Sequence, residues 1–231
     1  FLTGRSSDLE ATMNRPSLLK NPEVNIRLWQ FFIFDAIVVM FTSSIALVVD
    51  KRYGGGPREI GILMMFVVIA MIVIRGRLMT PMIRRFGEKR LYFFVIWCAV
   101  FSFFAFPWLS AFWMMFVFMF PFVLFMVIGR PIINVNITKA VEEDRQGEVS
   151  GYATTVQGLA ESLTPLLATG YLEIGSVNIG SFEIGAYFLI GITSILMAIG
   201  LRIIASWDIQ KYPAAYEDPQ DLLDRKKIML N

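Results

Sequence analysis

An uncharged stretch of 39 residues, from Leu91 to Gly129, constrains the fold of this chain more than any other feature. A helix of about 20 residues crosses the hydrocarbon core of a bilayer, so the stretch is too long for one span and suits two. Residues 106–110, which include Pro107, mark the turn between the two helices. We therefore expect a membrane protein whose helices run back and forth across the bilayer.

Composition supports this expectation and removes several classes of function. Hydrophobic residues make up 56% of the 231 residues and charged residues only 17%, against about 25% in a typical soluble domain. Histidine is absent and Cys98 is the only cysteine, so neither a disulfide framework nor an imidazole or cysteine metal site can form within the chain. We expect no enzyme activity, no metal and no cofactor.

The distribution of apolar segments predicts an all-α membrane protein with six transmembrane helices in one bundle. Residues 1–27 form a polar N-terminal segment and residues 206–231 a charged tail. The chain starts with Phe1 and lacks the order of a signal peptide, so we expect it to begin inside a longer protein. The predicted spans within residues 28–205 are about 28–49, 60–83, 91–106, 109–129, 149–172 and 184–205.

The basic residues indicate how these helices are oriented. The second span ends in a turn with four basic residues around Gly87. This turn belongs to a set of segments that carries eighteen of the 21 Lys and Arg residues: the N-terminal segment, residues 75–90, the loop at 130–148 and the C-terminal end from residue 202. The other three loops carry three. The positive-inside rule therefore predicts that both termini are cytoplasmic, or on the equivalent side of an organelle, and leaves the choice of membrane open. The four basic residues of the turn are Arg84, Arg85, Lys89 and Arg90.

Two charged residues in the first two spans are candidates for a functional pair. Asp35 lies seven residues into the first span, about 10 Å deep, and Arg75 lies eight residues before the end of the second, about 12 Å from the same face. An ionised group in lipid is costly, so pairing is favourable. We expect Asp35 and Arg75 to interact at a central cavity; a static pair between two helices, or an Arg75 that reaches the interface, is the alternative.

The fifth span carries a carboxyl group near the middle of the membrane. Glu161 lies twelve residues into the span, about 18 Å deep, and Gln157 is one helical turn away. A desolvated carboxyl group suits reversible protonation, so Glu161 is a candidate for proton coupling. The alternative is a neutral carboxylic acid that is hydrogen-bonded between helices.

Three segments resemble a known family. Arg84 to Arg90 after Pro81, Val141 to Gly151, and Pro165 fourteen residues further along are similar to the C-terminal six-helix half of a major facilitator superfamily transporter. The resemblance is greatest to the drug:proton antiporter branch that includes the tetracycline efflux proteins. It implies that the six spans correspond to helices 7–12 of that fold, and that substrate is bound between two six-helix halves.

We expect further residues to have structural or conformational roles. The basic turn with Gly87 is expected to act in conformational change, and Gly147, Gly151 and Pro165 in helix packing. The expected partners are the lipid bilayer, a small organic or drug-like solute, protons, and a missing N-terminal half or partner membrane chain; nucleic acid is not expected. A transporter-derived structural subunit of a larger membrane assembly, without transport of its own, is the alternative function.

Overall fold

The computed structural model describes residues 17–174, 176–179 and 182–216. Six long helical segments follow one another along the chain and confirm the predicted all-α membrane bundle; a short antiparallel hairpin, β1 paired with β2, is an addition. The elements are η1 (Leu18–Lys20), α2 (Pro22–Tyr53), α3 (Pro57–Val73), the π-helical η2 (Ile74–Leu78), α4 (Met79–Phe86), α5 (Glu88–Ala105), η3 (Phe106–Trp108), α6 (Phe112–Lys139), η4 (Glu143–Arg145), α7 (Gln146–Ile174), β1 (Ser176–Ile179), β2 (Phe182–Gly185), α8 (Ala186–Lys211) and η5 (Pro213–Tyr216).

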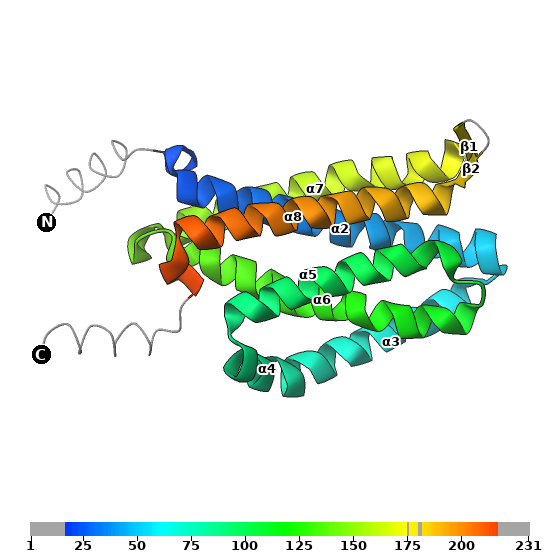
Figure 1. Ribbon diagram of the computed structural model, residues 1–231, viewed down its shortest axis with the longest axis horizontal. Helices are drawn as coiled ribbons and strands as arrows, with labels where there is room; N and C mark the ends of the chain where they lie inside the picture. Colours follow the sequence, from blue (N-terminus) through cyan, green and yellow to red (C-terminus); the bar gives the residue numbers. More distant parts are fainter. Residues whose placement is uncertain (1–16, 175, 180–181, 217–231) are drawn as a thin grey trace, which may run out of the picture.

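The long helices lie roughly parallel to a common axis, and η1 and η5 lie at the same end of the bundle (Figure 1). Five helical segments in the described part of the chain are long and apolar enough to cross a membrane. The sixth, α7, has 29 residues, about 43 Å, and is long enough but more polar. The five segments are Pro22–Tyr53, Pro57–Phe86, Glu88–Trp108, Phe112–Lys139 and Tyr187–Lys211.

Aromatic side chains fill the centre of the bundle. The ring of Phe41 on α2 lies 5.7 Å from that of Phe103 on α5 and 4.2 Å from that of Phe122 on α6, measured between centroids. On α6, Met115, Met119 and Phe122 are buried. The long run of Phe and Met in α6 is therefore core on one face, because side chains three and four residues apart share a helix surface.

Two glycines allow the sharp turns at the ends of the second helical segment. Gly54, with φ 61°, ends α2, and Gly87, with φ 75°, separates α4 from α5. Both positions lie in the left-handed region, which glycine adopts without the steric penalty of a Cβ atom. Beside Gly54, the Tyr53 hydroxyl donates to the Leu109 carbonyl at 2.8 Å, which ties the end of α2 to the α5–α6 turn.

The helices extend further than the predicted spans. In particular α6 continues to Lys139, so Asn134 and Asn136 lie within the helix and not in a loop after residue 129. Span length is set by the thickness of the bilayer, whereas backbone hydrogen bonding carries a helix on into the aqueous layer. The division of the chain into an N-terminal segment, a membrane domain and a tail stays a prediction, and residues 1–16 and 217–231 lie outside the described residues.

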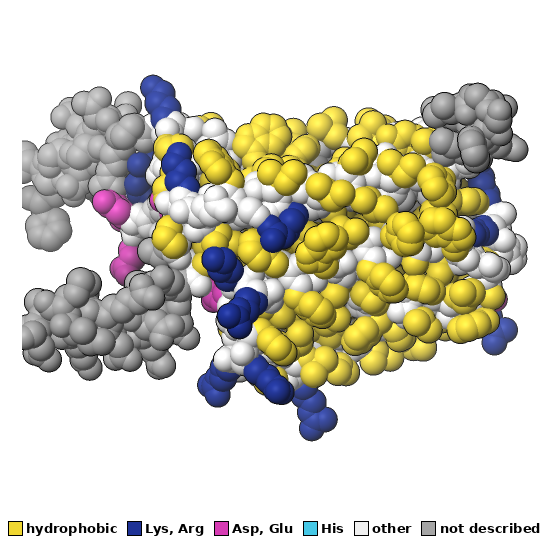
Figure 2. All heavy atoms as spheres, in the orientation of Figure 1, with side chains coloured by type: hydrophobic (Ala, Val, Ile, Leu, Met, Phe, Trp, Pro, Cys, Tyr) yellow, Lys and Arg dark blue, Asp and Glu magenta, His cyan; other side chains and the backbone are white. Residues whose placement is uncertain are grey.

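Apolar side chains cover most of the visible surface, and Lys and Arg side chains gather towards the end of the bundle where η1 and η5 lie (Figure 2). The segment Pro57–Phe86 is the least enclosed of the five apolar segments, with 17% of its most apolar stretch buried. An apolar surface of this extent needs lipid or another protein around it. The chain is an integral, multi-pass membrane protein.

Candidate substrate cavity

An ion pair between α2 and α6 lies near the middle of the bundle. The guanidinium of Arg130 donates to Oδ1 of Asp35. The Asp35 side chain is fully buried, whereas that of Arg130 is 31% exposed. Oδ2 of Asp35 is also buried and has no hydrogen-bond partner among the described residues. Asp35 therefore keeps one unsatisfied carboxylate oxygen inside the bundle, and the pair reaches the surface only through Arg130.

Asp35 does not pair with Arg75, which corrects the expectation from the sequence. Arg75 lies in the π-helical turn η2, is exposed, and forms no ion pair with a described residue. Similar depths of Asp35 and Arg75 in the membrane are compatible with a pair. Depth along a helix, however, does not define the direction in which a side chain points around that helix. Asp35 faces α6, and α3 with η2 packs chiefly against α6 and only slightly against α2.

The polar face of α7 lies next to this pair. Nε2 of Gln157 donates to Oε1 of Glu161 at 2.7 Å, so the two residues form one unit on the helix surface. Glu161 is exposed, and its charge is close enough to Asp35 to repel it electrostatically. Two carboxylates thus accompany one guanidinium, Arg130, near the centre of the bundle.

A polar hollow of about 240 Å³ opens between α2, α6 and α7. Cavities that enclose a whole small ligand are commonly about 300–1,000 Å³, so this hollow has the size of one part of a binding site. Gln157 connects the hollow to Glu161. The residues that line it are Phe31, Asn134, Ile137, Thr138, Ser150, Ala153, Thr154 and Gln157.

The other residues singled out from the sequence lie on the surface or within helices. The basic turn around Gly87 is exposed and lies away from the hollow. A side chain added at Gly147 or Gly151 would meet no neighbour within 4 Å, so the predicted packing at these glycines is not made by the described residues. Pro165 lies inside α7, which continues through it.

A second polar cluster, which sequence reasoning missed, joins α2 to α8 and η5. Oδ2 of Asp208 accepts hydrogen bonds from Gln30 at 3.0 Å and from the Tyr216 hydroxyl at 2.6 Å. Arg27, fully buried, lies 3.5 Å from the same oxygen, and Tyr92 donates to Gln30 at 3.3 Å. Arg27 lies just before the first predicted span and Asp208 just after the last. Both are charged residues next to apolar segments, which could have indicated a pair, but neither lies within a predicted span.

The polar atoms at the centre of the bundle offer carboxylate, guanidinium and amide groups. Among the described residues no three acidic or cysteine side chains lie close enough to hold a metal ion. Such polar groups can pair with an opposite charge or hydrogen-bond a polar solute.

Comparison with known proteins agrees with the fold and the membrane helices. The family model described as Major Facilitator Superfamily matches residues 5–165, which include α2 to α6 and most of α7. No curated protein and no solved structure matches the chain significantly. Since the matched segment covers more than half of the chain, this protein belongs to the major facilitator superfamily of transporters.

Proposed function

We propose that this chain is the C-terminal six-helix half of a proton-coupled transporter in the drug:proton antiporter branch, which moves a small organic solute by alternating access. Six helices are the number in one half of a major facilitator carrier, and such carriers bind substrate between the halves. The other wall of the polar hollow would come from an N-terminal half or a partner chain.

The observation that carries the proposal is the excess of carboxylate over guanidinium near the centre of the bundle. Asp35 is compensated by Arg130, whereas Glu161 has Gln157 as its hydrogen-bond partner and forms no ion pair with a described residue. A structural helix in lipid gains little from such a charge, which costs several kcal/mol to keep. Protonation of Glu161 would remove both that cost and its repulsion of Asp35, so Glu161 is the proposed coupling site.

The same charge balance indicates the class of substrate. With one negative charge left over at the cavity, an organic cation and a proton would compete for it, which is the basis of exchange between them. Arg75 is exposed away from the pair and is proposed to contact lipid or the other half. The excess of basic residues at the end that contains η1 and η5 supports a cytoplasmic position for both termini.

Proton flux in reconstituted vesicles tests the proposal. The complete native protein is placed in liposomes loaded with a pH-sensitive dye, and organic cations such as ethidium are added on one side. We expect wild-type protein to exchange protons for the cation and Glu161→Gln to lose the exchange. The matched control is Glu173→Gln, an exposed carboxyl on the same helix.

Two outcomes would count against the proposal. A Glu161→Gln protein with full proton dependence would remove Glu161 as the coupling site. Wild-type protein that moves neither protons nor any solute of a broad panel would favour the structural-subunit alternative. The intact mass of the native polypeptide also distinguishes a carrier from a structural subunit, because a complete carrier would have about twice the 26.3 kDa of this chain.

A further inference from the structure

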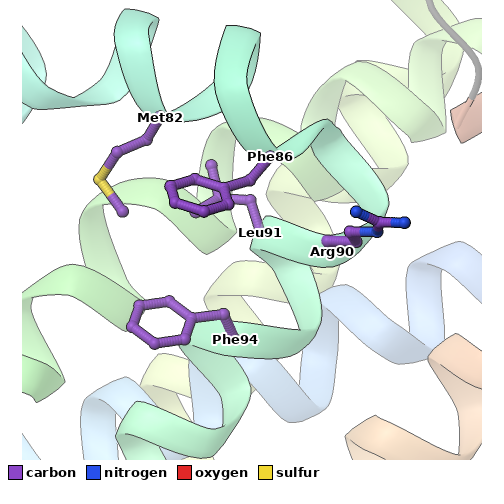
Figure 3. A pocket seen from close by; sticks show the side chains of 5 residues that line it. All are labelled: Met82, Phe86, Arg90, Leu91 and Phe94. Atoms are coloured by element: carbon purple, nitrogen blue, oxygen red, sulfur yellow. The ribbon is translucent and has the colours of Figure 1, made fainter.

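A separate apolar groove lies between α4 and α5, at the basic turn. It has a volume of about 410 Å³ and is lined by Met82, Phe86, Leu91, Phe94 and Arg90. The four apolar side chains extend from the two helices towards a common space, and the guanidinium of Arg90 lies to one side, turned away from them (Figure 3). The groove thus has an apolar body and a cationic edge.

The turn at Gly87 creates this groove. Gly87 ends α4 in the left-handed region, so the chain changes direction and α5 starts at Glu88. No residue of α4 is buried, and Phe86 is 50% exposed at the end of the helix. Apolar side chains that remain this accessible beside a hollow need an apolar occupant.

The groove is continuous with a surface that faces lipid. Phe94, which lines the groove, begins a stripe of large exposed side chains that runs along α5 and ends in η3, with neighbours spaced three or four residues apart and so on one face. In a membrane protein such a stripe is in contact with acyl chains. The residues of the stripe are Phe94, Trp97, Phe101, Phe104 and Trp108.

The charge around the groove complements an anion. Glu88, the acidic residue that follows Gly87 in the sequence, forms an ion pair with Lys139 at 3.6 Å. The basic residues Arg84, Arg85, Lys89 and Arg90 are all exposed, and none forms an ion pair with a described residue. Basic clusters at the end of a membrane helix attract anionic lipid head groups by about 1 kcal/mol for each Lys or Arg near the surface.

We propose that this groove binds one anionic phospholipid, with an acyl chain against Met82, Phe86, Leu91 and Phe94 and the phosphate at Arg90. The site holds a membrane lipid at the turn between the second and third membrane helices. It is distinct from the polar hollow between α2, α6 and α7, and it does not depend on the proposed transport.

Native mass spectrometry of the purified full-length protein tests the site directly. The protein in mild detergent is titrated with phosphatidylglycerol or phosphatidylcholine, and the fraction that retains one lipid is measured. We expect phosphatidylglycerol to be retained more tightly and Arg90→Gln to weaken its retention by about fivefold. Arg58→Gln, an exposed arginine near the opposite end of the chain's second membrane segment, is the charge-matched control and should have no effect.

A second pair of variants tests the apolar part of the site. Met82→Trp fills the groove without a change of charge and should weaken retention of the lipid, whereas Met65→Trp, on an exposed face of α3, should not. Soluble glycerophosphate, which carries the head-group chemistry without acyl chains, should not displace the lipid.

Four results would overturn the proposal. Equal effects of Arg90→Gln and Arg58→Gln would show diffuse attraction rather than a site. Displacement by glycerophosphate, or normal retention by Met82→Trp, would show that the groove is not used. Protein isolated from native membranes with another polypeptide in place of the lipid would show that the groove is a protein interface.

Discussion

Arg130 of α6 holds the fully buried carboxylate of Asp35 of α2 from one side only, since the second carboxylate oxygen of Asp35 has no partner among the described residues. The two residues are 95 positions apart in the sequence, so the pair joins two helices that are distant along the chain. The pair is exposed only through Arg130, whose side chain is 31% accessible, whereas the Asp35 side chain is fully buried.

Removal of Arg130 alone should destabilise the protein more than removal of the whole pair. Arg130→Gln leaves Asp35 buried without its cation, and we expect a loss of about 1–3 kcal/mol in the free energy of unfolding, limited by the partial exposure of Arg130. In the double variant Asp35→Asn, Arg130→Gln most of this loss should be recovered. Denaturant titration of the purified protein measures both; additive losses would contradict a direct pair.

At position 129, which precedes Arg130, glycine is predicted to be the only residue type that fits between α6 and α2 without a loss of stability. A Cβ atom at this position would lie 2.6 Å from Cε2 of Phe34, whose ring is buried and packs against Phe125 at 4.6 Å. Gly129→Ala should therefore destabilise the protein by about 1–3 kcal/mol through overpacking.

The matched control for Gly129 is Gly200→Ala in α8, where an added Cβ meets nothing within 4 Å. That change should be neutral or stabilising by up to about 1 kcal/mol, because alanine favours a helix over glycine. The melting temperature of each variant measures the effect. If both variants shift it in the same direction, α2 and α6 separate more easily at Gly129 than the structure implies.

The hydrogen bond between Tyr216 and Asp208 is predicted to hold η5 against the bundle. Tyr216→Phe removes a donor to a buried carboxylate and should cost about 1.5–3 kcal/mol in the free energy of unfolding. Tyr212→Phe is the control, since its ring faces Arg27 and the substitution keeps the ring. Proteolysis of the tail in the folded protein provides a second measurement, and should become faster only in Tyr216→Phe.

The same tyrosine predicts a dependence of stability on alkaline pH. Burial, and then the charge of Asp208, raise the pKa of the Tyr216 phenol above its ordinary value of 10.0. The folded protein therefore retains this proton where the unfolded chain loses it, so the stabilisation is complete below about pH 10 and is lost as the pH rises further. The decline in unfolding free energy above pH 10 should be shallower in Tyr216→Phe than in wild type; equal slopes would exclude this contribution.

Much of the fold follows from local properties of the chain. The uncharged stretch from Leu91 to Gly129 requires two membrane helices around the turn at Pro107, and the structure has α5, η3 and α6 there. Hydrophobic length and charge distribution are sums over neighbouring residues, so they can be read without knowledge of distant contacts. The lengths of the helices beyond the bilayer could not be read, because no local signal separates a helix in lipid from its continuation in water.

The sequence by itself determined that this protein crosses a membrane several times, and that Asp35 and Glu161 lie deep within its helices. The tertiary structure decided that Asp35 meets Arg130 rather than Arg75, that Arg27 and Tyr216 converge on Asp208, and that α4 and α5 leave a groove between them. The reason is geometric: composition and spacing define the depth of a residue along its own helix, whereas its partner depends on the rotation and packing of all the helices together.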